Sequence, residues 1–123
     1  MTKKYFINIS NHPSTKWGGK QLNAARSLGD IVDIPFPAVP PTALEDDIER
    51  MAGEVVAKVL EIGHGTSVVA HVMGEMTLTH AIVNKLSDFD ITCVASTTQR
   101  ISKEMPDGTK QSTFDFVMFR QYD

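Results

Sequence analysis

The first residues that could do chemistry follow directly after an apolar run near the start of the chain. Ile7 and Ile9 are followed by SNHPSTKW, residues 10–17. Hydroxyl and ammonium groups can bind phosphate, and an imidazole can take up or release a proton near neutral pH. We therefore expect this loop to hold an anionic ligand, with contacts from Ser10, Asn11, His12, Ser14, Lys16 and Trp17.

Part of this loop also allows a purely structural interpretation. Trp17 could stack on a nucleotide base, or it could pack as the first core residue of a following helix. Asn11 and His12 could merely shape the turn, since Pro13 holds the preceding residue extended. The loop is therefore a candidate ligand site, and its role depends on which other loops lie beside it in the fold.

A second unusual loop is MGEMT, residues 73–77. Gly74 would let the backbone approach a ligand closely, and Thr77 could cap the next helix. Glu75 would repel phosphate, so we expect it to accept a ribose hydroxyl, to act as a general base or to complete a metal site. The competing interpretation is that Glu75 only complements the helix dipole. Glu75 is therefore a candidate catalytic residue, and Gly74 and Thr77 are candidate ligand contacts.

The third loop is ASTTQR, residues 95–100. Ser96 and Thr97 are small hydroxyl donors, and Arg100 is a permanent cation suited to phosphate. Hydroxyl residues are also common in strands. We take Ser96, Thr97 and Arg100 as a third wall of ligand contacts.

Other reactive residue types have less distinctive surroundings. His71 lies within an apolar run and is expected to be a core or interface histidine, and the single cysteine, Cys93, is expected to be a buried thiol. The sequence has no Walker loop, no dinucleotide-binding glycine motif and no metal-ligand spacing. We therefore expect neither a cofactor nor a metal.

The elements that must position these loops follow from apolar periodicity and turn residues. The Thr42–Glu45 pair predicts a capping box, and residues 63–65 (GHG) end the helix that follows it. Pro106, Asp107 and Gly108 predict a hairpin turn, after which Phe114, Phe116 and Met118 alternate on one face. We expect strands over 5–10, 30–37, 66–74 and 91–97, and helices over 14–28, 42–62 and 77–89.

This alternation predicts an α/β fold with a Rossmann-like, mostly parallel sheet, helices on both faces and a C-terminal antiparallel hairpin strand. We expect the strand order 2-1-3-4-5. Ligands of such sheets bind beyond the carboxyl ends of the strands, where the strand order reverses. The loops after the first and third strands would meet there.

Length and charge limit the classes of partner. A chain of 123 residues fits one domain, residues 1–123. The net charge of −3 gives no general field for long nucleic acids or membrane surfaces. With no apolar signal region and no membrane-length apolar run, a cytoplasmic protein is expected.

The sequence ISNHPS after the first strand and MGEMTLTHAIV after the third resemble the CRISPR-associated Rossmann-fold group. More narrowly, the chain is similar to small standalone CRISPR-accessory proteins regarded as ring nucleases. The resemblance implies a homodimer that binds a cyclic oligoadenylate and cleaves it. The matching positions are Ser10, Asn11, His12, Gly74, Glu75 and Thr77.

The resemblance also implies a mechanism without a metal. A ribose 2′-hydroxyl would attack its own 3′-phosphate in line, helped by positioning and charge stabilisation. His12 or Glu75 would assist the proton transfer, while Lys16 and Arg100 would hold the phosphate. Glu75 stands where related turns often carry a second glycine or a basic residue.

Three alternatives remain open from the sequence. The chain could be a non-catalytic nucleotide-binding sensor or sponge, or an enzyme acting on another nucleotide metabolite. It could also be an interaction protein whose hairpin, residues 99–122, pairs with a partner through its apolar side chains.

Overall fold

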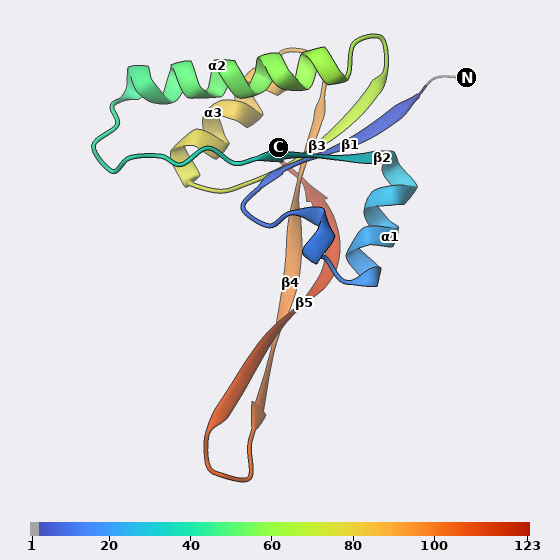
Figure 1. The fold of residues 1–123 in the computed structure, drawn as a ribbon, viewed down its shortest axis with the longest axis vertical. Coiled ribbons are helices and arrows are strands. Elements are labelled where there is room, and N and C mark those ends of the chain that lie inside the picture. Colours follow the sequence, from blue (N-terminus) through green and yellow to red (C-terminus); the bar gives the residue numbers. More distant parts are fainter. Residues whose placement is uncertain (1–2) are drawn as a thin grey trace.

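The computed structural model describes residues 3–123, which form a single five-stranded sheet with the order β2-β1-β3-β4-β5. Strands β2, β1, β3 and β4 run parallel, and β5 is antiparallel to β4 (Figure 1). The predicted fold class and strand order are confirmed. The strands are β1 (Lys4–Ser10), β2 (Asp30–Pro35), β3 (Ser67–Met73), β4 (Thr92–Glu104) and β5 (Lys110–Gln121).

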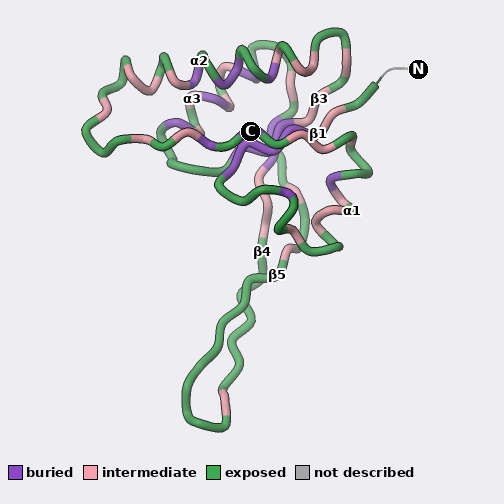
Figure 2. The backbone as a smooth tube through the Cα atoms, viewed as in Figure 1, coloured by how far each residue is buried: buried purple, intermediate pink, exposed green. Residues whose placement is uncertain are grey.

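Helices cover both faces of the sheet. The helices α2 (Glu45–Ile62) and α3 (Met76–Ser87) pack together on one face, and α1 (Gly19–Leu28) lies on the other (Figure 1). Figure 2 shows that the buried residues concentrate in the central strands and on the inner sides of α2 and α3. No helix within residues 3–123 combines the length and the apolar character needed to cross a membrane.

The central strand β1 explains why the two faces differ in chemistry. Its side chains alternate between the faces, as in any strand. Ile7 and Ile9 belong to the core under α2 and α3, whereas Phe6 packs on the α1 side. Asn8 and Ser10 share that side with Phe6 and are also buried. The sheet therefore carries an apolar face under α2 and α3 and a partly polar face under α1.

The predicted helix over residues 14–28 is wrong at its start. A 3-10 helix covers Ser14–Lys16, and α1 begins at Gly19 with Gly18 as its N-cap. Ser14 does not cap a helix, because its hydroxyl donates to Asp33 Oδ2 at 2.8 Å. A hydrogen bond thus holds the polar loop against β2, and α1 begins only after this loop.

The predicted capping box at Thr42 and Glu45 is also wrong. The N–H of Ala43 donates to the carbonyl of Pro40, so Thr42 lies inside a turn. The N-cap is Leu44, whose backbone N–H donates to Asp47 Oδ2 at 3.0 Å. The helix ends at the predicted place, with Gly63 as its C-cap.

Strand β4 and strand β5 form a long hairpin that extends far beyond the sheet. Strand β3 pairs with β4 only from Thr92 to Val94, whereas β5 pairs with β4 as far as Glu104. We call the projecting part, residues 98–116, the arm; it is almost wholly exposed (Figures 1 and 2). The predicted turn is present, with Gly108 at φ +87°.

A bulge at the base of the arm changes the predicted alternation. Thr97 pairs with Met118 and Thr98 pairs with Phe116, so Val117 has no partner on β4. An extra residue of this kind reverses the alternation of the strand that carries it. Phe116 therefore shares a face with Phe119, 4.8 Å away between ring centroids, and Met118 turns to the opposite face.

Candidate functional site

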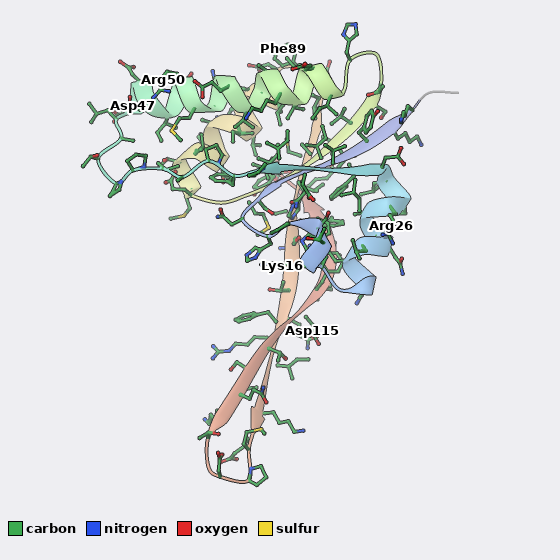
Figure 3. The ribbon with its side chains drawn as sticks, in the orientation of Figure 1. Lys16, Arg26, Asp47, Arg50, Phe89 and Asp115 are labelled. Carbon is green, nitrogen blue, oxygen red and sulfur yellow. The ribbon has the colours of Figure 1, made fainter. Side chains whose placement is uncertain are left out.

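A cavity of about 630 Å³ lies between the start of α1 and the base of the arm. One wall comes from the loop before α1 and its first turn, and the other comes from β4 and β5. In Figure 3, Lys16 lies on the loop wall and Asp115 on the arm. The lining residues are His12, Lys16, Trp17, Gly18, Lys20, Gln21, Gln99, Phe114, Asp115, Phe116 and Val117.

The loop wall of the cavity is basic. His12, Lys16 and Lys20 line it, and α1 begins beside it at Gly19. The first N–H groups of a helix have no acceptor within the helix and favour a negative charge. Asp115 is the acidic side chain on the opposite wall. The wall near α1 is therefore suited to phosphate.

Trp17 packs on the core, which is one of the two roles that the sequence left open, and it also lines the cavity. Its ring lies 6.1 Å from the Phe6 ring and 5.5 Å from the His71 ring, edge to face, so it packs on the core. Its indole N–H donates to the carbonyl of His12 at 3.1 Å. The same residue lines the cavity, where an aromatic wall can also receive a base.

A chain of hydrogen bonds, which we call the relay, crosses the sheet beneath this wall. Asn8 Nδ2 donates to Asp33 Oδ1 at 2.9 Å, and Asn8 Oδ1 lies 2.8 Å from His71 Nδ1. His71 Nε2 lies 2.7 Å from Ser96 Oγ, which accepts from Gln21 Nε2 at 3.1 Å. The relay joins β2, β1, β3, β4 and α1, and ends at a residue that lines the cavity.

His71 is the buried centre of the relay. Rings of Phe6, Trp17 and Phe119 surround its imidazole at centroid distances of 5.5–6.1 Å. Burial, with a smaller contribution from the charge of His12, lowers the pKa of His71 to about 4. The imidazole is therefore neutral at pH 7, and the expectation of a core histidine is confirmed.

Ser10 and Ser14, which were expected to contact a ligand, hold the loop against the sheet through their hydrogen bonds. Ser10 Oγ donates to Asn8 Oδ1 at 2.8 Å and accepts from the N–H of His12 at 3.2 Å. Both the N–H and the hydroxyl of Ser14 bind the Asp33 carboxylate. Asn11 is exposed and lines a separate cavity of about 230 Å³.

The MGEMT loop does not share the cavity of His12. Glu75 is the N-cap of α3, and its carboxylate accepts from the N–H and hydroxyl of Thr77 and from the N–H of Leu78. These hydrogen bonds lower the pKa of Glu75. Gly74 lines a different cavity, of about 360 Å³, and a Cβ at this position would lie 2.5 Å from the Phe36 ring. Thus Thr77 is not the cap that was predicted, and the structural interpretation of Glu75 accounts for its contacts.

The third loop divides between the relay and the arm. Ser96 belongs to the relay, whereas Thr97 Oγ1 bonds the backbone of Met118 beside the bulge. Arg100 lies farther out and donates to Ser112 Oγ at 3.2 Å. Its cross-strand partner is Phe114, which lines the cavity.

Several residues of this site were not predicted from the sequence. Asn8 and Asp33 interrupt apolar strands, and such an interruption is the signal that could have revealed the relay. Gln21 and Lys20 carry no such signal, because polar residues are ordinary on a helix surface. Gln99 and the arm residues depend on the long hairpin, whose path the sequence does not reveal.

The described part of the chain, residues 3–123, places no group of three or more His, Cys, Asp or Glu side chains so that they could hold a metal ion.

Comparison with known proteins gives a match to a family model. No curated protein and no solved structure matches the chain. A family model described as "Uncharacterized protein MJ1673 family" matches residues 4–120, which is nearly the whole length. The match includes all five strands up to Arg120 and both walls of the cavity. The chain therefore belongs to the MJ1673 family.

Proposed function

We propose that the protein binds a phosphate-bearing nucleotide in the cavity between α1 and the arm. The observation that carries this proposal is the lining of the cavity: basic side chains gather on one wall and aromatic rings stand on both. The volume of about 630 Å³ falls within the range of about 300–1,000 Å³ usual for small-molecule sites.

The lining divides into parts that match the parts of a nucleotide. Lys16, Lys20 and the first N–H groups of α1 supply positive charge and donors for phosphate. The rings of Trp17, Phe114 and Phe116 offer faces on which a base can stack, a contact worth about 1–3 kcal/mol per base.

Cyclic oligoadenylate is the nucleotide that we propose as the ligand, following the resemblance of the two loops. A ring of several nucleotides is larger than a drug-sized ligand, so one cavity would hold only part of it. We propose that a homodimer shares the ring. Exposed apolar side chains on the arm and at its base, Ile101, Phe114, Val117 and Met118, offer surface for such pairing. Since nucleotide messengers are intracellular, the proposal includes a cytoplasmic location.

Cleavage would need no cofactor. His12 lines the cavity and could accept the proton of a ribose 2′-hydroxyl. That oxygen would bond to the adjacent phosphorus while the bond from phosphorus to the 5′-oxygen breaks, and the leaving oxygen takes up a proton. The products would be a 2′,3′-cyclic phosphate and a 5′-hydroxyl, and Lys16 would stabilise the charge on phosphorus.

Binding without turnover is the second candidate, and one observation favours it. The other expected proton-transfer group, Glu75, has both carboxylate oxygens engaged in capping α3 and lies outside this cavity. A protein with this site could act as a sponge or sensor for the ligand.

The test is incubation of the purified protein with cyclic tri-, tetra- and hexa-adenylate in EDTA, followed by chromatography of protein and nucleotide. Linear products that disappear with His12→Ala, but persist with His64→Ala, would support cleavage. The control residue His64 is an exposed histidine in the loop between α2 and β3. Intact nucleotide that elutes with the protein would support the second candidate. No product and no binding would refute the proposal.

A further inference from the structure

We infer that Gln21 selects the base of the bound nucleotide, because the relay forces its amide to present a carbonyl oxygen to the cavity. This inference rests on the proposed nucleotide site and names the part of the ligand that the site would read. The argument begins at Asp33, at the far end of the relay, and follows the direction of each hydrogen bond to the cavity wall.

The orientation of the Asn8 amide is fixed by acceptors. Its Nδ2 lies 2.9 Å from Asp33 Oδ1 and 2.9 Å from the carbonyl oxygen of His12. A carboxylate and a carbonyl can only accept hydrogen bonds. The reversed amide would place three acceptor oxygens together, so Asn8 Nδ2 must face this pair. Asn8 Oδ1 consequently faces His71.

The tautomer of His71 follows from that orientation. Asn8 Oδ1 can only accept, so Nδ1 of His71, 2.8 Å away, must carry the proton. The neutral imidazole then has a lone pair at Nε2. Ser96 Oγ lies 2.7 Å from Nε2 and must donate its single proton to it.

The last step sets the amide of Gln21. Because the hydroxyl proton of Ser96 is already used, Ser96 Oγ can only accept from Gln21, and Nε2 of the amide must face it at 3.1 Å. The opposite atom, Oε1, accepts no hydrogen bond from residues 3–123 and is not among their buried unpaired atoms. Since Gln21 lines the cavity, this oxygen is the acceptor that the wall offers to a ligand.

A fixed acceptor favours a ligand with a donor at the matching place. Adenine carries an exocyclic N6 amino group that donates, whereas guanine presents the acceptor O6 on the same edge. An amide that could turn over would serve either base. The relay prevents that rotation, because a turned Gln21 would face Ser96 with an acceptor opposite an acceptor.

The polarity of the relay can be tested without any ligand. Two-bond 1H–15N correlation spectra at pH 7 report which imidazole nitrogen carries the proton, and His71→Gln identifies the signals of His71. We expect the proton on Nδ1. A proton on Nε2 of His71 would overturn the inference whatever the ligand binds.

The base preference is tested with cyclic tetra-adenylate and an analogue in which unsubstituted purine replaces adenine. We expect the analogue to bind roughly five- to tenfold more weakly, the value of one net hydrogen bond. Gln21→Met removes the acceptor, so it should bind both ligands equally. Ser96→Ala frees the Gln21 amide to rotate, so it should reduce the difference in affinity between the two ligands. Ser102→Ala, on the same strand but outside the relay, should leave that difference unchanged.

The outcomes separate this inference from the proposed function. If both ligands bind the unaltered protein equally, the inference fails while nucleotide binding stands. If neither ligand binds, the proposed function fails and the base preference fails with it. Should Gln21→Met not fold, Ser96→Ala and the tautomer of His71 still decide the question.

Discussion

Asn8 Nδ2 donates a 2.9 Å hydrogen bond to Asp33 Oδ1, which joins a side chain buried in β1 to a carboxylate on the neighbouring strand β2. The same carboxylate holds the N–H and hydroxyl of Ser14. The carboxylate thus positions both the interior relay and the loop that forms one wall of the cavity. Disturbing either residue should affect folding and binding together.

Asn8→Ala is expected to lower the free energy of unfolding. The substitution leaves His71 Nδ1 without its acceptor inside the sheet, whereas Ser10 Oγ keeps the carbonyl of His12 as an acceptor at 3.2 Å. A buried donor that loses its partner costs about 1–3 kcal/mol. Urea unfolding measures the change, and Asn23→Ala, at an exposed position of α1, is the matched control. Equal stability of the two variants would contradict a structural role for the relay.

Acid should destabilise the protein before its carboxylates titrate. Burial lowers the pKa of His71 to about 4, against about 6.5 in the unfolded chain. Between these values the unfolded chain binds the extra proton, so stability is full above pH 6.5 and falls toward pH 4. The loss approaches about 3 kcal/mol, at about 1.4 kcal/mol per pKa unit. Urea midpoints from pH 4 to 7 measure it, and in His71→Gln this part of the pH dependence should disappear.

Glu75→Ala should weaken the start of α3 and leave nucleotide chemistry intact. The carboxylate caps α3 and lies outside the cavity that contains His12. We expect a melting temperature a few degrees lower, since the N–H groups of Thr77 and Leu78 lose their acceptor. Retained binding or cleavage of cyclic tetra-adenylate checks the second part. Selective loss of turnover at unchanged stability would restore the catalytic role expected from the sequence.

Lys16→Gln combined with Lys20→Gln should weaken nucleotide binding by roughly tenfold and reduce its dependence on salt, because two charges leave the phosphate side of the cavity. Isothermal titration at low and moderate salt measures both effects. Lys58→Gln, at an exposed position of α2 on the opposite face of the sheet, is the control. Equal affinities for the double variant and this control would place the phosphate elsewhere.

Alanine substitutions at two glycines should change the free energy of unfolding in opposite directions. A Cβ at Gly74 would lie 2.5 Å from the buried Phe36 ring, so Gly74→Ala should destabilise the fold by about 1–3 kcal/mol. Gly53 lies within α2, and a Cβ there meets no atom within 4 Å. Gly53→Ala should therefore raise the free energy of unfolding by about 0.5–1 kcal/mol. Thermal unfolding of the pair tests whether close packing, rather than a ligand, requires glycine at position 74.

The sheet could be predicted from the sequence because its signals are local or follow general rules. Apolar runs, prolines and glycines mark the strands and turns, and the handedness of parallel crossovers limits their order. Helix starts are harder to predict, because Ser14 and Thr42 are of residue types that often cap helices but here serve a tertiary hydrogen bond and a turn. A side chain such as Ser14 does not cap a helix when a residue from another element binds it, and the sequence alone does not show how close that residue lies.

The candidate site was only partly predictable for a similar reason. His12, Lys16 and Trp17 line one cavity as expected of a common site, but Glu75 and Gly74 do not join them. The second wall comes from the arm, whose direction depends on the continuity of β4 and on the bulge at Val117. The relay depends on strand register, which places Asn8 between Asp33 and His71.

Trp17 is the only tryptophan of the chain, and it lies between the aromatic core and the cavity. Its fluorescence is therefore an intrinsic optical reporter that needs no attached dye. Unfolding would move the indole into water and shift its emission to the red, whereas a base stacked on its exposed side would quench the emission without that shift. One spectrum could thus distinguish a ligand that enters the cavity from one that disrupts the fold.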